Sequence, residues 1–330
     1  KLKEHLLSTF IQGSHRRSTA IKGSTANPCD VDIVAVTNLS RSKRTAAEAH
    51  RLFQPFLERY YSGQYEAQDR SWCIAINAEV KLDLVPTSEP GSPELLEQFR
   101  KSLSDWTPNP TSVKSTAGRT LTESVLEAAK RDRDWDKTEP LWIPDRKLLV
   151  WEQTHPLFLI AWTARKNLEC NGHFGHVVKV IKWWRRHMKP TPKYPKGYPL
   201  EHLIGDCCPD GIKTVAEGVT RTFETIASTF ATAAWQRKTP FLAARGVTNP
   251  EVNVMSRVDG EDFAKFHAHV ADAAELAREA LEAQDVTTSA QLWHKLLGNP
   301  FPKPPGGDSD DEPRFTPPKG PARPQEERFA

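Results

Sequence analysis

The sequence predicts an α+β fold in which a mixed β-sheet is followed by a lobe of helices. Short apolar runs bounded by turn residues, which are typical of strands, occur early in the chain at Asp30–Val36, Trp72–Ile76 and Val80–Val85. Later in the chain apolar residues recur at helical spacing, most clearly over Phe174–Met188 and Gly260–Gln284. Strands that precede helices in this way favour an α+β architecture over alternating units.

The composition is that of an ordinary globular protein. The chain has 330 residues, of which 38% are hydrophobic and 26% are charged, so a core is easily built. Its net charge of +3 does not require a nucleic-acid partner, although Arg41–Arg44 and Lys182–Lys189 are basic clusters suited to phosphate. The five cysteines form no repeating framework, which indicates a reducing cytoplasm. No apolar run has the length of a membrane helix, and no signal peptide is visible.

Three aspartates in the strand region are candidate metal ligands. Asp30 and Asp32 lie two residues apart, so in a strand their side chains project from the same face. Such carboxylates repel each other unless they are protonated or bridged by a cation, and acidic oxygen ligands suit Mg²⁺ better than zinc. If the strand of Asp83 lies beside the first, the three carboxylates converge and hold two Mg²⁺ or Mn²⁺ ions for displacement at phosphorus.

A Gly-Ser pair precedes these aspartates. Gly13 and Ser14 offer backbone N–H groups and a hydroxyl at an expected helix start, where a triphosphate would bind. Taken alone, the pair carries little information, and a solvated strand start is the alternative interpretation of Asp30 and Asp32. The order of Gly-Ser, Asp-x-Asp and a later strand aspartate is what indicates metal-dependent nucleotide chemistry.

These residues resemble the nucleotidyltransferases of the DNA polymerase beta-like superfamily. Three segments resemble more narrowly the bacterial cyclic GMP-AMP synthase-like enzymes (CD-NTases), and most of all clade D of the anti-phage operons called CBASS: Phe10–Ile21, Pro28–Val34 and Lys193–Gly205. The resemblance extends over nearly the whole chain. It implies a polymerase beta-like catalytic core with a helical lobe, and synthesis of a cyclic oligonucleotide from ATP and other nucleoside triphosphates, with cyclic tri-AMP as the expected product.

The resemblance also implies roles for single residues. Asp30 and Asp32 hold both ions, and Asp83 ligates the ion that activates the ribose hydroxyl for attack on the donor α-phosphate. Lys182 matches a lysine that reaches the donor triphosphate, although a solvated basic face is the alternative. Related enzymes often have a serine near the next helix start, where this chain has Tyr198; we expect this residue to stack on a base, to bind phosphate or to pack in the core.

The same reasoning divides the chain into three parts. We expect a catalytic core at 1–150, a helical lobe closing the cleft at 151–298, and a disordered Pro-rich tail at 299–330. Lys1–Phe10 has the apolar spacing of an amphipathic helix, and the lack of an initial Met predicts a truncated N-terminus. In relatives whose operons encode ubiquitin-transfer-like proteins the C-terminal residue is conjugated, which implies this role for Ala330. HORMA regulatory proteins and an operon-encoded effector are the other implied partners.

Two further groups receive no chemical role from the sequence. For Asp145 and Arg146 we expect a salt bridge that holds a loop. A cysteine and histidine group invites a zinc interpretation, but buried cysteines are favoured because the spacing matches no standard site: Cys170, His173, His176, Cys207 and Cys208. Helices are also expected over Thr45–Tyr61, Pro93–Leu103, Thr122–Arg133, Leu157–Glu169, Ile212–Gln236 and Thr287–Leu297, and irregular chain over Trp135–Pro144.

Two other functions remain as alternatives. One is a transferase of the same superfamily that adds a nucleotide to RNA, to a protein or to a small molecule. The other is a catalytically silent nucleotide-binding regulator, against which the presence of all three aspartates argues.

Overall fold

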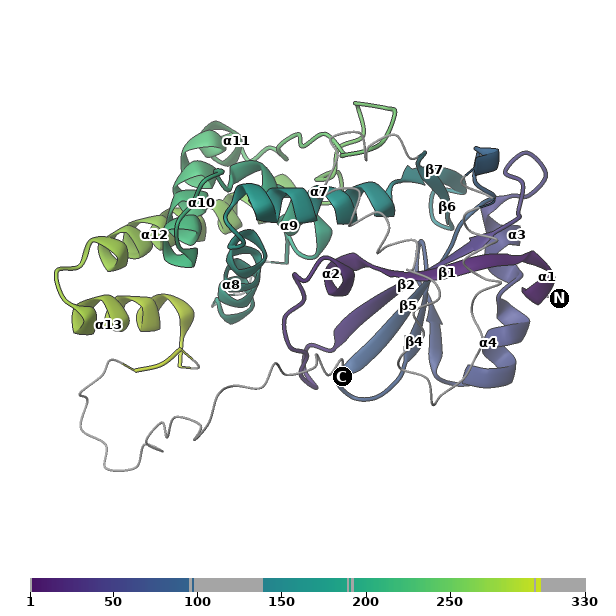
Figure 1. The fold of residues 1–330 in the computed structure, drawn as a ribbon, viewed down its shortest axis with the longest axis horizontal. Helices are drawn as coiled ribbons and strands as arrows, with labels where there is room; N and C mark the ends of the chain where they lie inside the picture. Colours follow the sequence, from purple (N-terminus) through teal and green to yellow (C-terminus); the bar gives the residue numbers. More distant parts are fainter. Residues whose placement is uncertain are drawn as a thin grey trace.

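The computed structural model describes residues 2–94, 97, 139–188, 190, 193–299 and 301–303. A five-stranded sheet with its helices (residues 2–86, the sheet lobe) lies beside a bundle of helices (residues 156–297, the helical lobe), as Figure 1 shows. The helix expected over Thr122–Arg133 and nearly all of the tail lie outside the described residues, as does most of Pro93–Leu103.

The sheet lobe contains the mixed sheet that the sequence predicts. Its elements are α1 (Leu2–His5), β1 (Leu6–Gln12), α2 (Gly13–Arg16), β2 (Cys29–Thr37), α3 (Ala46–Arg51), α4 (Gln54–Tyr61), β3 (Tyr65–Ala67), β4 (Trp72–Ala75) and β5 (Val80–Pro86). The strand order is β1-β2-β5-β4-β3, with β2 and β5 parallel and the other neighbours antiparallel. The expected pairing of β4 with β5 is confirmed.

Side-chain alternation along β2 gives the sheet two covered faces. Ala35 packs with Phe53 and Leu57 in a cluster beneath α3 and α4. Val34 and Val36 point the other way and pack against residues of α7 (Pro156–Glu169), the first helix of the helical lobe. Because side chains alternate, the even-numbered aspartates of β2 share this second face. The sheet therefore presents them toward the helical lobe.

The prediction of a helix over Lys1–Phe10 is wrong beyond His5. Residues from Leu6 onward form β1, which pairs with β2 through a continuous ladder from Ser8 to Gln12. Leu7 and Phe10 are three residues apart, which fits a helical stripe; in β1 both reach the same buried cluster, with the strand register shifting between Leu6 and Ser8. The neighbouring strand decides between the two, since backbone pairing with β2 outweighs a weak local preference.

Two other expected boundaries change. The expected helix over Thr45–Tyr61 is divided into α3 and α4 near Leu52, with Pro55 in the first turn of α4, a position where no backbone N–H is needed. The expectation of irregular chain up to Pro144 is wrong, because β6 (Leu141–Asp145) pairs with β7 (Val150–Thr154). In a two-stranded hairpin each strand has an open edge, which tolerates a proline.

The helical lobe contains α7, α8 (Phe174–His187), α9 (Tyr198–Cys207), α10 (Val215–Thr229), α11 (Ala231–Trp235), α12 (Gly260–Glu282) and α13 (Val286–Leu297). The helix expected over Ile212–Gln236 is thus two helices that meet at Phe230. The lobe has its own core, which includes Val177, Ile181, Phe223, Phe263 and Phe266 together with the buried cysteines Cys170, Cys207 and Cys208. Among the described helices, none is long and apolar enough to cross a membrane.

Candidate active site

A cavity of about 1450 Å³ lies between the sheet lobe and the helical lobe. Its walls come from the α2 turn and strands β2 and β5 on one side, and from α8, α9 and β7 on the other. The residues predicted for the site all line this cavity: Gly13, Ser14, Asp30, Asp32, Asp83, Lys182 and Tyr198. The fold therefore gathers residues separated by more than half of the chain.

The register of the parallel pair sets the aspartates side by side. Asp32 is the Cα partner of Asp83, and Asp30 is the partner of Lys81. The two strands are therefore neighbours, as the convergence of the three carboxylates requires. Asp30 is exposed at the start of the strand, and within the described residues no three Asp, Glu, His or Cys side chains already form a closed metal site. Other ligands to an ion would come from water and from substrate phosphates, as is usual for Mg²⁺.

Both of the facing aspartates hold their protons more tightly than an exposed carboxyl does. Burial, followed by the charge of Asp83, raises the pKa of Asp32 to about 6. Burial, followed by the charge of Asp30, raises the pKa of Asp83 to about 6. Carboxylates that are driven together in a partly dry site favour protonation or a cation between them.

One atom in particular supports a cation at this place. Oδ1 of Asp83 is buried and has no hydrogen-bond partner. A buried carboxylate oxygen is costly when it is left unsatisfied, so such an atom in a native fold calls for an explanation. The donor set of three carboxylates consists of hard oxygen ligands and fits Mg²⁺ or Mn²⁺.

The conformation of Gly13 brings the α2 turn against Asp32. Its φ of +71° is left-handed, and a Cβ at this position would overlap Asp32 Oδ2 and lie 2.7 Å from Asp32 Cγ. Only glycine allows this approach. Ser14 follows directly, and its carbonyl accepts hydrogen bonds from the backbone N–H groups of Thr19 and Ala20. The turn is thus fixed over the aspartates.

Lys182 forms an ion pair with Glu201, a residue to which sequence reasoning assigned no role. Its Nζ donates to Glu201 Oε1 at 2.8 Å and to the carbonyl of Thr19 at 3.0 Å. Arg17 donates to the other oxygen of Glu201 at 2.8 Å, as does the Thr19 hydroxyl at 3.0 Å. Burial alone would raise the pKa of Glu201, but Arg17 and Lys182 hold it below its ordinary value.

Tyr198 stands at the start of α9 and has its hydroxyl 3.1 Å from Nδ1 of His202. Burial raises the pKa of this phenol to about 12. The hydroxyl therefore takes part in a hydrogen bond within α9, while the residue still forms part of the cavity wall. A stacking role for its ring stays a prediction.

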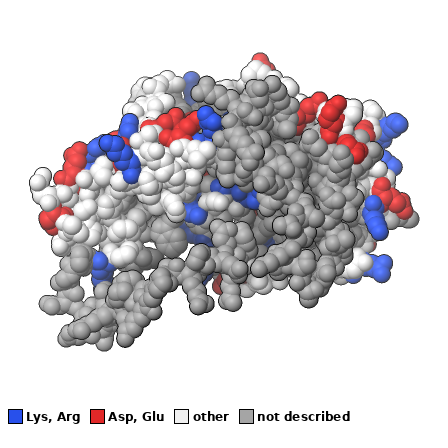
Figure 2. Space-filling view, in the orientation of Figure 1, with Lys and Arg blue, Asp and Glu red and all other residues white. Residues whose placement is uncertain are grey.

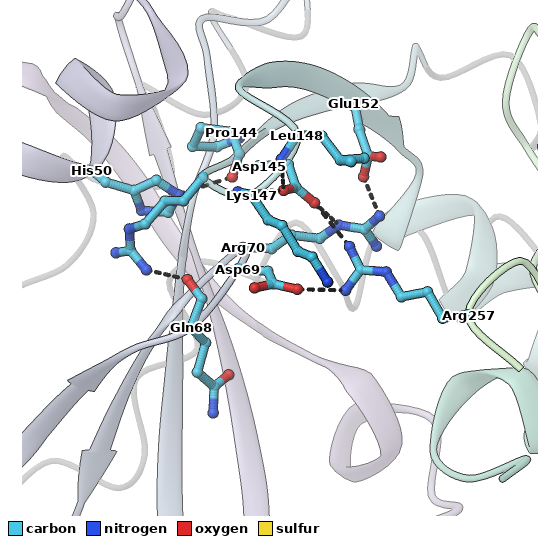
Figure 3. Close-up of polar contacts among 11 residues, drawn as sticks. His50, Gln68, Asp69, Arg70, Pro144, Asp145, Lys147, Leu148, Glu152 and Arg257 are labelled. Carbon is cyan, nitrogen blue, oxygen red and sulfur yellow. Dashed lines mark hydrogen bonds and ion pairs between the residues drawn. The ribbon is translucent and has the colours of Figure 1, made fainter.

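A second network, built on Asp145, joins the two lobes away from the aspartates (Figure 3). Asp145 is fully buried; its Oδ1 accepts the backbone N–H groups of Lys147 and Leu148, and its Oδ2 accepts Arg70 and Arg257. Arg257 lies just before α12 and also pairs with an acidic residue of the sheet lobe, Asp69. The expected salt bridge at Asp145 is present, and it connects lobes rather than only a loop.

Arg146, the neighbour of Asp145, serves the sheet lobe alone. It donates to the carbonyls of Gln68 and Ser71, and its guanidinium lies 4.0 Å from the centre of the Trp72 ring. Burial lowers its pKa to about 10. These contacts hold the β3–β4 connection in place.

The residues that sequence reasoning missed are Arg17 and Glu201. Glu201 lies among Leu200, Leu203 and Ile204, all buried, and a single acid within an apolar stretch of helix implies a buried partner. That signal was present but does not name the partner.

On the face of the molecule drawn in Figure 2, basic and acidic side chains are interspersed over both ends rather than separated.

Comparisons with known proteins agree with this geometry. A family model described as the Second Messenger Oligonucleotide or Dinucleotide Synthetase domain matches residues 1–96. The chain is 43% identical to the cyclic AMP-AMP-GMP synthase of Enterobacter hormaechei, in an alignment that covers the whole chain and 90% of that protein. It is also similar to the cyclic AMP-AMP-AMP synthase of an Acinetobacter species, at 28% identity. That alignment covers 89% of this chain and 73% of the Acinetobacter protein.

A solved structure supports the fold. The Escherichia coli MS115-1 protein CdnC, in its complex with HORMA-deltaN, superposes with a TM-score of 0.57 over 91% of this chain and 85% of that one, at 16% identity. The sheet, the Gly-Ser turn and the paired aspartates define a nucleotidyltransferase with a DNA polymerase beta-like core. The chain belongs to the CD-NTase family of bacterial cyclic-oligonucleotide synthases, which use divalent metal ions.

Proposed function

We propose that this chain makes a cyclic trinucleotide from ATP and GTP. The observation that carries the proposal is the Asp32 and Asp83 pair, which faces the cavity with raised pKa values and a buried oxygen that has no partner. The sequence led us to expect cyclic tri-AMP. The 43% identity to a cyclic AMP-AMP-GMP synthase favours the mixed product over the product of the more distant Acinetobacter enzyme.

In this proposal each residue of the cavity has a defined task. Asp30, Asp32 and Asp83 hold two Mg²⁺ or Mn²⁺ ions, which supply stabilisation of the charge that develops at phosphorus. Gly13 and Ser14 bind the triphosphate from one side and Lys182 from the other. Asp83 accepts the proton of the attacking ribose hydroxyl. The hydroxyl oxygen bonds to the donor α-phosphate, and pyrophosphate leaves.

The size of the cavity supports a reaction between two nucleotides. Its volume of about 1450 Å³ exceeds the roughly 300–1000 Å³ that is usual for a site holding one small molecule. A donor and an acceptor can thus lie in it together. Tyr198 offers an aromatic ring in the wall for stacking on one of the bases. Three transfers are needed in all: the first joins two nucleotides, the second adds a third, and the last closes the ring.

We also propose a setting for this activity. The resemblance to clade D supports a part in anti-phage defence in the cytoplasm, with an operon-encoded effector that binds the cyclic product. The Escherichia coli structure contains a HORMA protein as partner of CdnC, which supports a HORMA-type regulator here. A ubiquitin-transfer-like protein acting on Ala330 is the other proposed partner. Both are tested by co-purification from cells that express the whole operon.

The test of the activity is incubation with Mg²⁺ and labelled ATP, GTP, CTP and UTP, singly and in pairs, followed by phosphatase and mass spectrometry. We expect a phosphatase-resistant ring of two adenylates and one guanylate, which requires ATP and GTP together. Asp32→Asn should abolish it, whereas Asp272→Asn, at an exposed position on α12, should not. A ring made from ATP alone would establish cyclic tri-AMP instead.

The same experiment separates the two alternatives. A linear product, or label transferred to an added RNA or protein, would identify a transferase of another kind. Nucleotide binding without product, unchanged in Asp32→Asn, would identify a silent regulator.

A further inference from the structure

Glu201 is a buried carboxylate that receives donors from both lobes. Arg17 and Thr19 come from the chain that follows the Gly13 turn, whereas Lys182 comes from α8. The side chain of Glu201 is 8% exposed, that of Arg17 10% and that of Lys182 14%. All of the groups in this cluster are therefore largely removed from bulk water.

The charges of this cluster do not cancel. Two cations share one carboxylate, which leaves an excess of one positive charge in a poorly solvated place. Such a charge is unfavourable unless an anion meets it. Arg17 and Lys182 both line the large cavity, as do Gly13 and Ser14. The carboxylate of Asp32 lies within reach of the charge of Arg17, and an anionic ligand in the cavity can supply further negative charge.

Both cations keep donors for such a ligand. The hydrogen bonds to Thr19 and Glu201 use two of the three protons of the Lys182 ammonium. Arg17 uses Nε and Nη2 on Glu201, out of five N–H donors. The charge of Arg17 also acts on Asp32, so Arg17 lies near the aspartate pair as well.

A small hole borders the cluster. Its volume is about 10 Å³, which has room for about one water molecule, and it is lined by Arg17, Glu201, Tyr198 and Trp162 among others. The guanidinium of Arg17 lies 5.8 Å from the centre of the Tyr198 ring. Glu201 holds both cations at the cavity wall, so they are already placed for binding.

We propose that Arg17 is a second polyphosphate-binding residue beside Lys182, and that Glu201 is the positioning residue that holds both cations toward the cavity. This inference rests on the proposed function, because the ligand is the triphosphate of the donor nucleotide. In this inference the hydroxyl of Thr19, which donates to Glu201, helps to hold that carboxylate in place. Charge-assisted hydrogen bonds to phosphate are among the stronger polar contacts, so the loss of either residue should be measurable.

The test compares affinity for α,β-methylene ATP, which cannot transfer its nucleotide, with affinity for AMP, by calorimetry in Mg²⁺. For Arg17→Gln we expect the affinity for the triphosphate to fall about 10–100-fold while AMP changes less than about 2-fold. For Glu201→Gln we expect the same pattern at about 10-fold. Arg278→Gln removes an arginine that pairs with Glu224 and is not among the residues of the cavity wall, and it should leave the ratio of the two affinities unchanged.

Equal losses for both ligands in Arg17→Gln, or no loss for either, would overturn the inference. If Glu201→Gln does not fold, Arg17→Gln still decides, because Glu201 keeps Lys182 as its partner in that variant. The measurement needs no turnover. A wild-type protein that prefers the triphosphate but yields no cyclic product would therefore contradict the proposed function and leave this inference standing.

Discussion

Asp83 on β5 and Asp145 on β6 are both strand aspartates with oxygens hidden from solvent, yet their surroundings are opposite. Asp145 accepts two backbone N–H groups and two arginines. Although burial would raise its pKa, the Leu148 N–H and Arg70 hold it below the ordinary value. Asp83 receives a hydrogen bond from the Cys73 thiol, but its Oδ1 has no partner and burial raises its pKa to about 6.

The difference shows how this chain separates structure from chemistry. A buried carboxylate whose acceptor sites are filled by protein donors fixes the fold and has nothing left for a ligand. A buried carboxylate left unsatisfied destabilises the fold until a cation or proton arrives, which is typical of functional sites. The contrast supports our proposal that Asp83 belongs to a metal site, whereas Asp145 connects the lobes.

The largest expected effect is on catalysis. Asp83→Asn should lower the rate of product formation by at least about 10³-fold, because the site loses a ligand for the cation and the acceptor of the hydroxyl proton. Its melting temperature without metal should not fall, since the change removes a repulsive charge. Initial rates and thermal melts of the purified variant measure both. A variant that is unstable as well as inactive would break the comparison.

Gly13→Ala should reduce activity about 100-fold, because the added methyl group overlaps the carboxylate of Asp32. Gly63→Ala is the matched control: Gly63 has a φ of +74° with nothing within 4 Å of the position of a Cβ. Both variants bear the cost of a left-handed alanine, about 1 kcal/mol, but only the first disturbs the site. Equal activities in the two would show that contact with Asp32 is unimportant.

Asp145→Asn should lower the free energy of unfolding. An amide group must turn its NH₂ either to the two backbone donors or to the two arginines, so one set of hydrogen bonds is lost at a cost of about 3 kcal/mol. We expect the denaturation midpoint to fall clearly, whereas Asp69→Asn, which loses one exposed contact with Arg257, should change it little. Activity per folded molecule should stay within a few-fold. Chemical denaturation with parallel assays checks this.

The smallest effect is a dependence of stability on pH. The unfolded chain releases these protons near 3.8, whereas folded Asp32 and Asp83 release them near 6. Between these values the folded state binds more protons, so this pair lowers stability as the pH rises from about 4 to 6. Asp145 and Glu201 have lowered pKa values, and their contribution is lost as the pH falls through those values.

Comparison with a variant isolates this effect from the other groups. Without divalent metal, Asp83→Asn should melt roughly 2–5 °C above the wild type at pH 7.5 and level with it at pH 4.5. Added Mg²⁺ should raise the wild-type melting temperature at pH 7.5 and much less at pH 5. A difference between the two proteins that does not change with pH would contradict the raised pKa values.

Much of the site is predictable from local sequence, because its parts are strand and turn patterns. Asp30, Asp32 and Asp83 have the alternation and apolar flanks of strands, and Gly13 lies at a turn. The strand β1 was not predicted, since the spacing of Leu6, Leu7 and Phe10 also fits a helix and only the neighbour β2 decides. Pairing between distant segments is the information that local patterns lack.

The inter-lobe networks are beyond local patterns for the same reason. Arg17 and Glu201 are 184 positions apart, and Asp145 and Arg257 are 112 apart. A charged residue in an apolar helix indicates that a partner exists but not which one. The chain of contacts from Lys182 through Glu201 to the Gly13 turn appears only once the two lobes are placed together.

The most direct test of the central contrast is a titration with Mn²⁺ followed by electron paramagnetic resonance at pH 7.5, on the wild type, Asp83→Asn and Asp145→Asn. The account predicts that Asp83→Asn weakens Mn²⁺ binding at least about 10-fold, whereas Asp145→Asn binds like the wild type. Equal binding by the wild type and Asp83→Asn, or a loss confined to Asp145→Asn, would contradict it.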